Sequence, residues 1–301
     1  MTELKEAKER IEACAVDENK CYYNDEYKNM CYLDISNEVP VIRFKCLDKY
    51  DWVMLAFSTR LGGVSNDIEY LKSLNFGWDR GDRIENVREN YKKICKSIGG
   101  DYHKLILSDQ VHETKVLYVD ERYEAGNNIE KRMSGVDGLT TDKKDLILAT
   151  SYADCVPLFF VDTLNKAIAS SHSGWRGTVG QIGRKTVELM KKKYGSNEKD
   201  IICIVGPSIC QECYEVSKDV IDEIKKTYES SVWKDIFYEK EDGKYQLDLW
   251  AANYHQLKRA GIPHEHIYIS GVCTCCNSDI LYSHRASHGK RGNLNGFMML
   301  R

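Results

Sequence analysis

The amino-acid sequence predicts an α+β fold with mixed or antiparallel sheets. Short runs rich in branched and aromatic residues, typical of strands, cluster along the chain, and helical patterns do not alternate with them regularly. The 301 residues contain no internal repeat, no low-complexity segment and no Gly/Ser-rich linker. This length suits one large domain or two small ones.

The first third of the chain contains a short helix, several strands and a longer helix. Apolar residues at Ile11, Ala13 and Cys14 predict a short N-terminal helix. Three strand-like runs follow it in the sequence: MCYLDI, VIRFK and WVMLAFST. In residues 82–99 the apolar side chains recur at three- and four-residue steps, which predicts a helix that ends at Gly99.

Strands and helices continue through the rest of the chain. Five strand-like runs come next: KLILSD, TKVLYVD, DLILAT, VPLFFV and KAIASS. Residues 178–195 predict a helix that stops at Gly195, and DIICIVG predicts another strand. Two more helices are expected at residues 217–230, with Ser217 as N-cap, and at residues 248–261, and a late strand is expected at HIYISG.

Composition and charge exclude several classes of protein. The formal net charge is −3 and the pI is about 6.3, so there is no basic excess to bind nucleic acid. Apolar runs fall short of the roughly 20 residues that a membrane span needs. The charged N-terminus lacks the apolar core of a signal peptide, so we expect a cytoplasmic protein. Because disulfides are rare in the cytosol, the twelve cysteines are expected to be free thiols, metal ligands or a catalytic thiol.

A predicted hairpin brings a thiol and an imidazole together. The strands VPLFFV and KAIASS are joined by DTLN, an Asx-rich turn whose centre lies midway between Cys155 and His172. Directly opposed residues in antiparallel strands have Cβ atoms about 4.5–5.5 Å apart. A thiolate and an imidazole at that distance can bind one tetrahedral metal, act as a Cys–His nucleophilic pair, or be satisfied core residues.

The residues after His172, SGWRGT, favour a functional interpretation. Glycines permit close backbone approach, and the start of a helix offers free N–H groups to an anion. Arg176 adds a planar guanidinium suited to phosphate. The alternative is that Trp175 packs in the core and Arg176 forms a surface ion pair.

An open zinc site needs three protein ligands, and His112 is the strongest candidate for the third. It lies in LSDQVHET, at the end of an apolar strand. The pair His264 and His266 lies near a proline turn, where a surface position is expected, and His255 lies within a predicted helix. Zinc held by two histidines and one cysteine keeps its fourth position for water or substrate.

Five other cysteines form two groups far apart in the sequence. Cys210 and Cys213 are spaced as C-x-x-C, and CTCC places Cys273, Cys275 and Cys276 close together. Two distant C-x-x-C pairs can close a Cys₄ zinc site. Adjacent cysteines rarely bind the same ion, however, so the sequence favours buried thiols over a second zinc.

Seven motifs occur in the order typical of one family: FSTRLGGVS, SLNFG, DQVH, ADCVPLFF, SHSGWRGT, GPSICQECYEV and CTCCNSDILYSHR. Over roughly residues 40–301 the chain resembles the YfiH-like family, also called the laccase-domain, polyphenol oxidase or peptidoglycan editing factor family. Departures are modest: Glu113, Cys210 and Glu212 stand where glycine, glycine and cysteine are usual. The resemblance implies one layered α/β/β/α domain, a YfiH-like catalytic domain over residues 41–301, and it leaves residues 1–40 as an N-terminal extension outside the match.

The resemblance also implies a zinc ion bound by His112, Cys155 and His172, the same three residues. It implies purine nucleoside phosphorylase activity on adenosine, inosine, guanosine and methylthioadenosine, together with adenosine deamination. Purine nucleosides and phosphate are therefore the expected partners. The protein is expected to act as a monomer or homodimer, without nucleic acid or membrane.

Phosphorolysis needs groups that hold phosphate below C1′ of the ribose. Arginines beside glycine-rich backbone suit this role, and the sequence offers Arg60 and Arg176, with Arg285 as a third. Asn75 is a candidate contact to a sugar or base edge. Asp154, next to Cys155, is a candidate for moving the proton in deamination or for orienting a neighbouring group.

Three alternative functions stay open. A Cys–His hydrolase or amidase acting on peptidoglycan precursors would use Cys155 as nucleophile and His172 as base. A copper-dependent polyphenol oxidase is disfavoured, because a multicopper site needs on the order of ten histidines with repeated H-x-H pairs. The chain has eight histidines and one such pair, so copper is expected to bind only in vitro. A binding protein without turnover is the last alternative.

Overall fold

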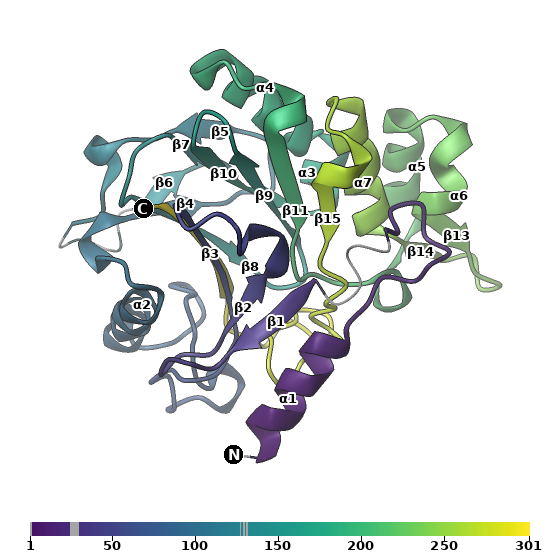
Figure 1. Cartoon of the computed structure of the whole chain (residues 1–301). Helices are drawn as coiled ribbons and strands as arrows, with labels where there is room; N and C mark the ends of the chain where they lie inside the picture. Colours follow the sequence, from purple (N-terminus) through teal and green to yellow (C-terminus); the bar gives the residue numbers. More distant parts are fainter. Residues whose placement is uncertain (1, 25–29, 127, 129, 131) are drawn as a thin grey trace.

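In a computed structural model, two sheets face each other and helices cover both outer faces, an α/β/β/α arrangement (Figure 1). The structure describes residues 2–24, 30–126, 128, 130 and 132–301. Both sheets contain parallel and antiparallel pairs. The predicted fold class, a layered single domain with mixed sheets, is confirmed.

The larger sheet has seven strands. In chain order they are β1 (Cys31–Asp34), β2 (Val41–Phe44), β3 (Val53–Ser58), β4 (Leu105–Asp109), β6 (Arg132–Ser134), β8 (Ile147–Tyr152) and β16 (Leu294–Leu300). Their spatial order is β1-β2-β3-β16-β8-β4-β6. The pairs from β1 to β8 are antiparallel, whereas β4 pairs in parallel with β8 and β6.

The smaller facing sheet has six strands in the spatial order β15-β11-β9-β10-β7-β5. Their bounds are β5 (Val116–Tyr118), β7 (Gly138–Thr141), β9 (Val156–Asp162), β10 (Ala167–Ser173), β11 (Ile201–Val205) and β15 (Ile267–Ile269). The three central pairs are antiparallel, and both edge pairs are parallel. The strand-like runs of the sequence therefore divide between two sheets.

Strand β9 explains why the run VPLFFV is apolar throughout. Successive side chains of a strand point to opposite faces of the sheet. Leu158 and Phe160 pack against the helices outside the sheet, whereas Phe159 and Val161 pack between the two sheets. All seven residues of β9 are buried, as expected for a sheet that is covered on both faces.

Helix α2 (Ile84–Ile98) covers the outer face of the seven-stranded sheet. Its buried residues include Val87, Tyr91 and Ile94, which confirms the predicted apolar periodicity. The helix ends as predicted at Gly99, whose φ of 73° is a left-handed conformation that glycine adopts without steric cost.

The outer face of the six-stranded sheet is covered by α3 (Trp175–Val179), α4 (Ile182–Tyr194) and α7 (Leu249–Arg259). The prediction of one continuous helix over residues 178–195 was therefore wrong. The chain breaks at Gly180 and Gln181, and Gln181 has a left-handed φ of 59°. Its amide bonds to the Thr178 carbonyl at 3.1 Å and to the Tyr228 hydroxyl at 3.2 Å, contacts that the local sequence does not reveal.

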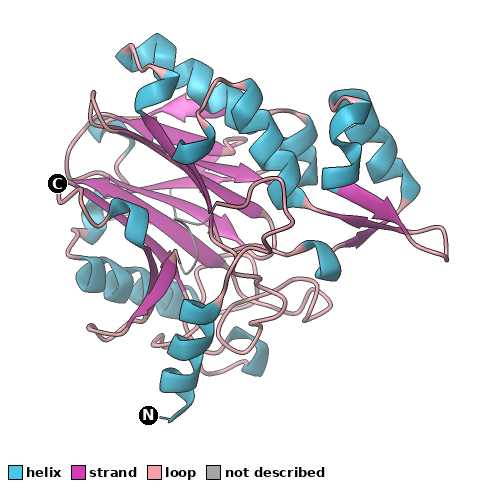
Figure 2. Ribbon diagram, turned by 45° about the vertical axis from the view of Figure 1, so that its right-hand side comes forward, coloured by secondary structure: helices cyan, strands magenta, loops and turns pink. Residues whose placement is uncertain are grey.

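A third, small sheet lies beyond the two facing sheets (Figure 2). It contains β12 (Glu215–Val216), β13 (Phe237–Glu239) and β14 (Tyr245–Leu247), with β14 in the middle. Helices α5 (Lys218–Thr227) and α6 (Trp233–Ile236) accompany it. Ser217 takes the predicted N-cap position of α5, but its hydroxyl bonds to Asp219 instead of to a helix N–H.

The N-terminal extension packs against the larger sheet. Helix α1 (Thr2–Ala13) buries Ala7 and Ile11 in the core between the sheets, and Arg10 pairs with Asp279 at 2.5 Å. Strand β1 also falls within the extension, while residues 1 and 25–29 lie outside the described residues. Among the helices of the described chain, none combines the length and the apolar character that crossing a bilayer requires.

Candidate active site

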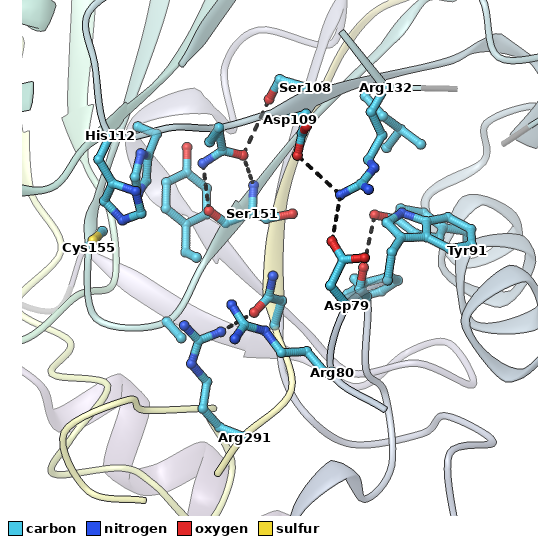
Figure 3. Close-up of a pocket in the computed structure, with 18 residues that line it drawn as sticks. Asp79, Arg80, Tyr91, Ser108, Asp109, His112, Arg132, Ser151, Cys155 and Arg291 are labelled. Carbon is cyan, nitrogen blue, oxygen red and sulfur yellow. Dashed lines mark hydrogen bonds and ion pairs between the residues drawn. The ribbon is translucent and has the colours of Figure 1, made fainter. Parts of the chain in front are cut away.

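The structure brings His112, Cys155 and His172 together (Figure 3). One potential ligand atom from each residue lies within 4.8 Å of the others. His112 follows β4, Cys155 immediately precedes β9, and His172 lies near the end of β10. The His112 and His172 rings are nearly perpendicular, at 81°, with centroids 4.8 Å apart. Two sheets therefore meet at this point, since β4 belongs to one and β9 and β10 to the other.

The hairpin register differs from the prediction. His172 pairs with Pro157, and Ser173 pairs with Val156, so Cys155 is not directly opposite His172. The turn covers residues 163–166 instead of 162–165, because Asp162 stays in the strand and pairs with Ala167. The offset leaves the two side chains close enough to belong to one cluster.

Asp137, a residue that the sequence analysis missed, holds both histidines in place. Its carboxylate accepts N–H bonds from Val111 at 3.3 Å, His112 at 2.9 Å and Glu113 at 3.0 Å. Three successive amides around one anion, with His112 at a left-handed φ of 63°, form a backbone nest. The same carboxylate accepts a bond from Nδ1 of His172 at 3.0 Å. Only a lone acid between Gly135 and Gly138, in front of a strand, marks Asp137 in the sequence.

The buried charges favour a thiolate at Cys155. Burial alone raises the pKa of a thiol, but the charge of His172 and hydrogen bonds from His112 and His172 outweigh it, so the pKa of Cys155 is lowered. Burial lowers the pKa of His172, but Cys155 and the hydrogen bond to Asp137 outweigh that effect and raise it. The pair therefore stabilises the deprotonated sulfur that metal ligation or nucleophilic attack requires.

The motif SHSGWRGT packs directly against the cluster at Gly174. A Cβ atom at Gly174 would lie 3.0 Å from Sγ of Cys155 and 3.4 Å from Cδ2 of His112. Glycine leaves the space that the two side chains occupy. Arg176, two residues later, is exposed and stacks on the Trp175 ring at 4.3 Å from its centroid.

A pocket of about 180 Å³ opens beside the three residues (Figure 3). Aromatic side chains form part of its wall, and Trp78 stacks on Tyr91 with the rings 12° from parallel. Gln110 and Ser151 form another part of the wall and are held together by two hydrogen bonds. The Gln110 side-chain amide accepts from Ser151 N at 2.7 Å and donates to Ser151 O at 2.8 Å. The pocket therefore combines a flat apolar surface with fixed polar groups.

Three arginines line the pocket, and they differ in their partners. Arg132 pairs with Asp79 at 3.3 Å and with Asp109 at 3.2 Å. Arg80 and Arg291 also line the pocket (Figure 3), and neither has a carboxylate partner among the residues that the structure describes. Burial and the charge of Arg80 lower the pKa of Arg291 to about 10. This uncompensated positive charge suits an anion.

The four residues predicted to contact substrate are not among the described residues that line this pocket. Arg60 donates to the backbone carbonyls of Lys72 and Ser278, and Arg285 donates to those of Cys213 and Glu215. Arg176 is exposed, as described above.

Asn75 is buried behind the wall, where its carbonyl accepts from Gly77 at 2.8 Å and from Asn293 at 3.0 Å. Because Asn293 lines the pocket, Asn75 positions the wall.

Asp154 precedes Cys155 and has a left-handed φ of 83°. Its carboxylate accepts from the Thr274 hydroxyl at 2.6 Å and from the backbone N–H of Arg285 at 2.7 Å. Its carbonyl accepts from Ile209 N at 3.0 Å. These bonds tie the chain before Cys155 to two loops.

The residues present fit a zinc ion. Two imidazoles and one thiolate are the donors that zinc prefers, and three protein ligands are the number that open zinc sites use. Asp137 binds Nδ1 of His172, which leaves Nε2 as the ligand atom. The arrangement defines a class: a layered α/β enzyme fold with a His₂Cys metal-type site beside an arginine-lined pocket.

Comparison with known proteins identifies the family. Residues 54–301 match the family model described as "Multi-copper polyphenol oxidoreductase laccase", and the chain belongs to this family. The crystal structure of hypothetical protein YfiH from Bacillus licheniformis superposes with a TM-score of 0.83. It is 31% identical, and the match covers 89% of this chain and 99% of that chain. The resemblance to the YfiH-like family is therefore confirmed.

Two curated relatives carry names of purine enzymes. Purine nucleoside phosphorylase YlmD from Bacillus subtilis (strain 168) is 35% identical over 249 residues, which cover 82% of this chain and 88% of the relative. Adenosine deaminase RL5, from an unknown prokaryotic organism, is 35% identical over 232 residues, covering 76% of this chain and 87% of the relative. The relatives thus include phosphorylase and deaminase names within one family.

Proposed function

We propose that the protein is a zinc-dependent purine nucleoside phosphorylase that accepts adenosine, inosine, guanosine and methylthioadenosine and also deaminates adenosine. The observation that carries this proposal is the cluster of His112, Cys155 and His172 beside two arginines for which the described part of the chain offers no carboxylate partner. The names of the relatives support the same chemistry. When bound, zinc supplies a Lewis acid and lowers the pKa of a coordinated water.

Arg80 and Arg291 are the proposed phosphate ligands, in place of Arg60, Arg176 and Arg285. Their guanidinium groups can form paired hydrogen bonds to phosphate oxygens. Trp78 offers an aromatic surface on which a purine can stack. Base and phosphate would then occupy one pocket.

In phosphorolysis a phosphate oxygen bonds to C1′ of the ribose while the bond from C1′ to the purine nitrogen breaks and the base leaves with the electron pair. Arg80 and Arg291 hold the phosphate for in-line attack, and Asp137 keeps His112 and His172 in fixed orientations. In deamination, water replaces the amino group at C6 and ammonia leaves. Asp154 acts in this scheme by positioning Cys155, since its carboxylate is engaged by Thr274 and the Arg285 backbone.

The experiment is a nucleoside panel with zinc-loaded protein and phosphate, followed by chromatography of the released base. Inosine should yield hypoxanthine only when phosphate is present. Cys155→Ala, with its fold checked by circular dichroism, should lower the rate about 100-fold or more. An unchanged rate in this variant would refute the site.

Arginine variants test the phosphate assignment. Loss of a charged hydrogen bond costs about 1.5–3 kcal/mol, so Arg80→Met and Arg291→Met should each raise the KM for phosphate roughly tenfold or more. Arg176→Met should leave it unchanged if phosphate lies on Arg80 and Arg291. A raised KM only in the Arg176 variant would restore the assignment made from the sequence.

Two alternatives give different results in the same assays. A Cys–His hydrolase would be alkylated at Cys155 irrespective of zinc, whereas bound zinc protects a ligand thiolate from alkylation. A copper-dependent polyphenol oxidase would need copper in the purified protein and oxygen consumption with a phenol. Elemental analysis and an oxygen electrode separate these outcomes from phosphorolysis.

A further inference from the structure

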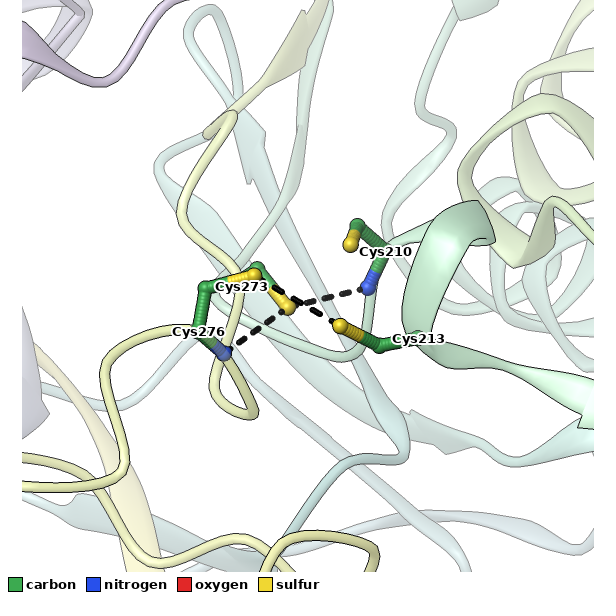
Figure 4. Close-up of side chains that lie close together, drawn as sticks. All are labelled: Cys210, Cys213, Cys273 and Cys276. Carbon is green, nitrogen blue, oxygen red and sulfur yellow. Dashed lines mark hydrogen bonds between the residues drawn. The ribbon is translucent and has the colours of Figure 1, made fainter.

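Four cysteine sulfurs converge at a second place in the molecule, outside the pocket (Figure 4). Cys210 and Cys213 come from the loop after β11, and Cys273 and Cys276 from the loop after β15. All four sulfurs lie within 4.8 Å of one another, and those of Cys213 and Cys276 are 3.5 Å apart. The two loops are joined by a bridge between Ser208 and Cys273.

The spacing of the sulfurs matches metal coordination. All twelve cysteines are free, and a disulfide needs sulfurs about 2.05 Å apart. Four thiolates about 2.3 Å from a tetrahedral zinc ion stand about 3.8 Å from one another. The Cys213–Cys276 separation of 3.5 Å is close to that value, and no pair of the four sulfurs is more than 4.8 Å apart.

Local hydrogen bonds support a thiolate in this cluster. The backbone N–H groups of Cys210, at 3.3 Å, and Cys276, at 3.4 Å, both point to Sγ of Cys273. Amides directed at a ligand atom stabilise its negative charge and fix its position. Cys273 is buried and Cys276 is exposed, so an ion has a route from solvent.

We propose that Cys210, Cys213, Cys273 and Cys276 bind one zinc ion in a closed tetrathiolate site, separate from the His112, Cys155 and His172 cluster. Four protein ligands leave no open position, which is the arrangement of a structural zinc. Cys275 takes no part, because its sulfur is not in the cluster. The sequence argued against a second zinc because adjacent cysteines rarely bind the same ion. That argument does not apply here, since of the adjacent Cys275 and Cys276 only Cys276 belongs to the cluster.

The proposed ion would also support the active site. Thr274, between two of the ligands, donates to the Asp154 carboxylate, and Arg285 donates to the Cys213 carbonyl at 3.2 Å and through its backbone N–H to Asp154. Fixing both cysteine loops therefore fixes the residue before Cys155. The cluster lies at a cavity that Lys20 and Cys14 of the N-terminal extension also line.

The test uses the full chain carrying His112→Ala and His172→Ala, so that its outcome does not depend on the proposed phosphorylase site. After chelation and reconstitution, this protein should bind one Co²⁺ per chain with intense thiolate-to-cobalt absorption, and Zn²⁺ should displace it. Adding Cys276→Ser should remove the absorption and that metal equivalent. Adding Cys275→Ser, the matched control, should change neither.

A second measurement needs no substitution. In the unmutated protein, chelation should make Cys213 and Cys276 react faster with a thiol reagent, as mapped by mass spectrometry, and zinc should restore protection. Folded protein that binds no metal in the histidine variant, a Cys276→Ser spectrum equal to its parent, or a Cys213–Cys276 disulfide would overturn the site. Iron in place of zinc after purification would overturn the choice of metal.

Discussion

A single buried carboxylate organises the metal-type cluster. Asp137 fixes the backbone around His112 and the ring of His172, yet it binds neither substrate nor metal in the proposed scheme. The three potential ligands were predictable because each stands at or near a strand end within a recognisable motif. Asp137 was not predictable, because its role depends on hydrogen bonds with residues 24 to 35 positions away in the sequence.

Replacing Asp137 by Asn should weaken zinc binding at the cluster by about 10–100-fold. Oδ1 of Asp137 accepts from the His112 N–H and the His172 ring, and Oδ2 accepts from the Val111 and Glu113 N–H groups. The substitution replaces one of these oxygens by an NH₂ group, so two of the four hydrogen bonds are lost whichever way the amide turns. Competition with a chromophoric chelator measures this affinity in the Cys276→Ser background, which isolates the cluster from the tetrathiolate site.

Asp162→Asn is the matched control for this prediction. Asp162 is a buried aspartate at the other end of β9, where it accepts N–H bonds from Leu164 at 3.0 Å and Asn165 at 2.8 Å. It should lower the stability of the protein and leave the zinc affinity intact. If both variants bind zinc equally, Asp137 does not position the ligands.

The arginine pocket could not be predicted from single motifs. Arg80 lies in the irregular segment before α2 and Arg291 in the loop before β16, more than 200 positions away, so no local pattern pairs them. Arg60 and Arg176 have the glycine neighbours that suggested an anion site. In the structure, however, the Arg60 guanidinium donates to a backbone carbonyl and that of Arg176 stacks on an aromatic ring. The glycines beside these arginines, such as Gly63 and Gly174, allow close packing of neighbouring chain segments and side chains.

Strands and their faces were more predictable than their pairing. Apolar runs marked the strands, whereas the hairpin register was displaced from the prediction because Asp162 stays paired in β9. The partner of each strand depends on the twist and fit of two whole sheets. Strand β16, the last of the chain, lies in the middle of the seven-stranded sheet between β3 and β8. No local sequence pattern predicts this position.

Gly296 in β16 provides a test of how the two sheets fit. A Cβ atom at this position would lie 2.5 Å from Cζ of Phe159, a β9 side chain between the sheets. Gly296→Ala should therefore lower the free energy of unfolding by about 1–3 kcal/mol, the usual cost of overpacking. Urea denaturation measures the change.

The double variant Gly296→Ala/Phe159→Leu separates this clash from a backbone effect. Leucine removes the ring atoms that the new methyl group would meet, so the two substitutions together should cost less than the sum of their separate effects. Strict additivity would show that the sheets accommodate the methyl group in another way.

Considered as a whole, the molecule places its pocket where loops of both sheets meet. Residues from β4, α2, β8, β10 and the loop before β16 all contribute to the wall. The layered architecture was implied by the family resemblance, whereas the apolar runs by themselves predicted only an α+β fold with mixed or antiparallel sheets. The contribution of the N-terminal extension to the core was not predictable, because residues 1–40 lie outside the matching motifs.

The last prediction concerns this extension. Ile11 on α1 has no exposed surface and packs in the core between the sheets. Ile11→Ala should lower the free energy of unfolding by about 2–5 kcal/mol, because burial is lost and a cavity remains. Ile35→Ala, at a 41% exposed isoleucine in the same extension, should stay within about 0.5 kcal/mol of the parent protein. Equal effects in urea denaturation would mean that α1 unfolds independently of the layered core, whereas the expected difference makes the extension part of one cooperative unit.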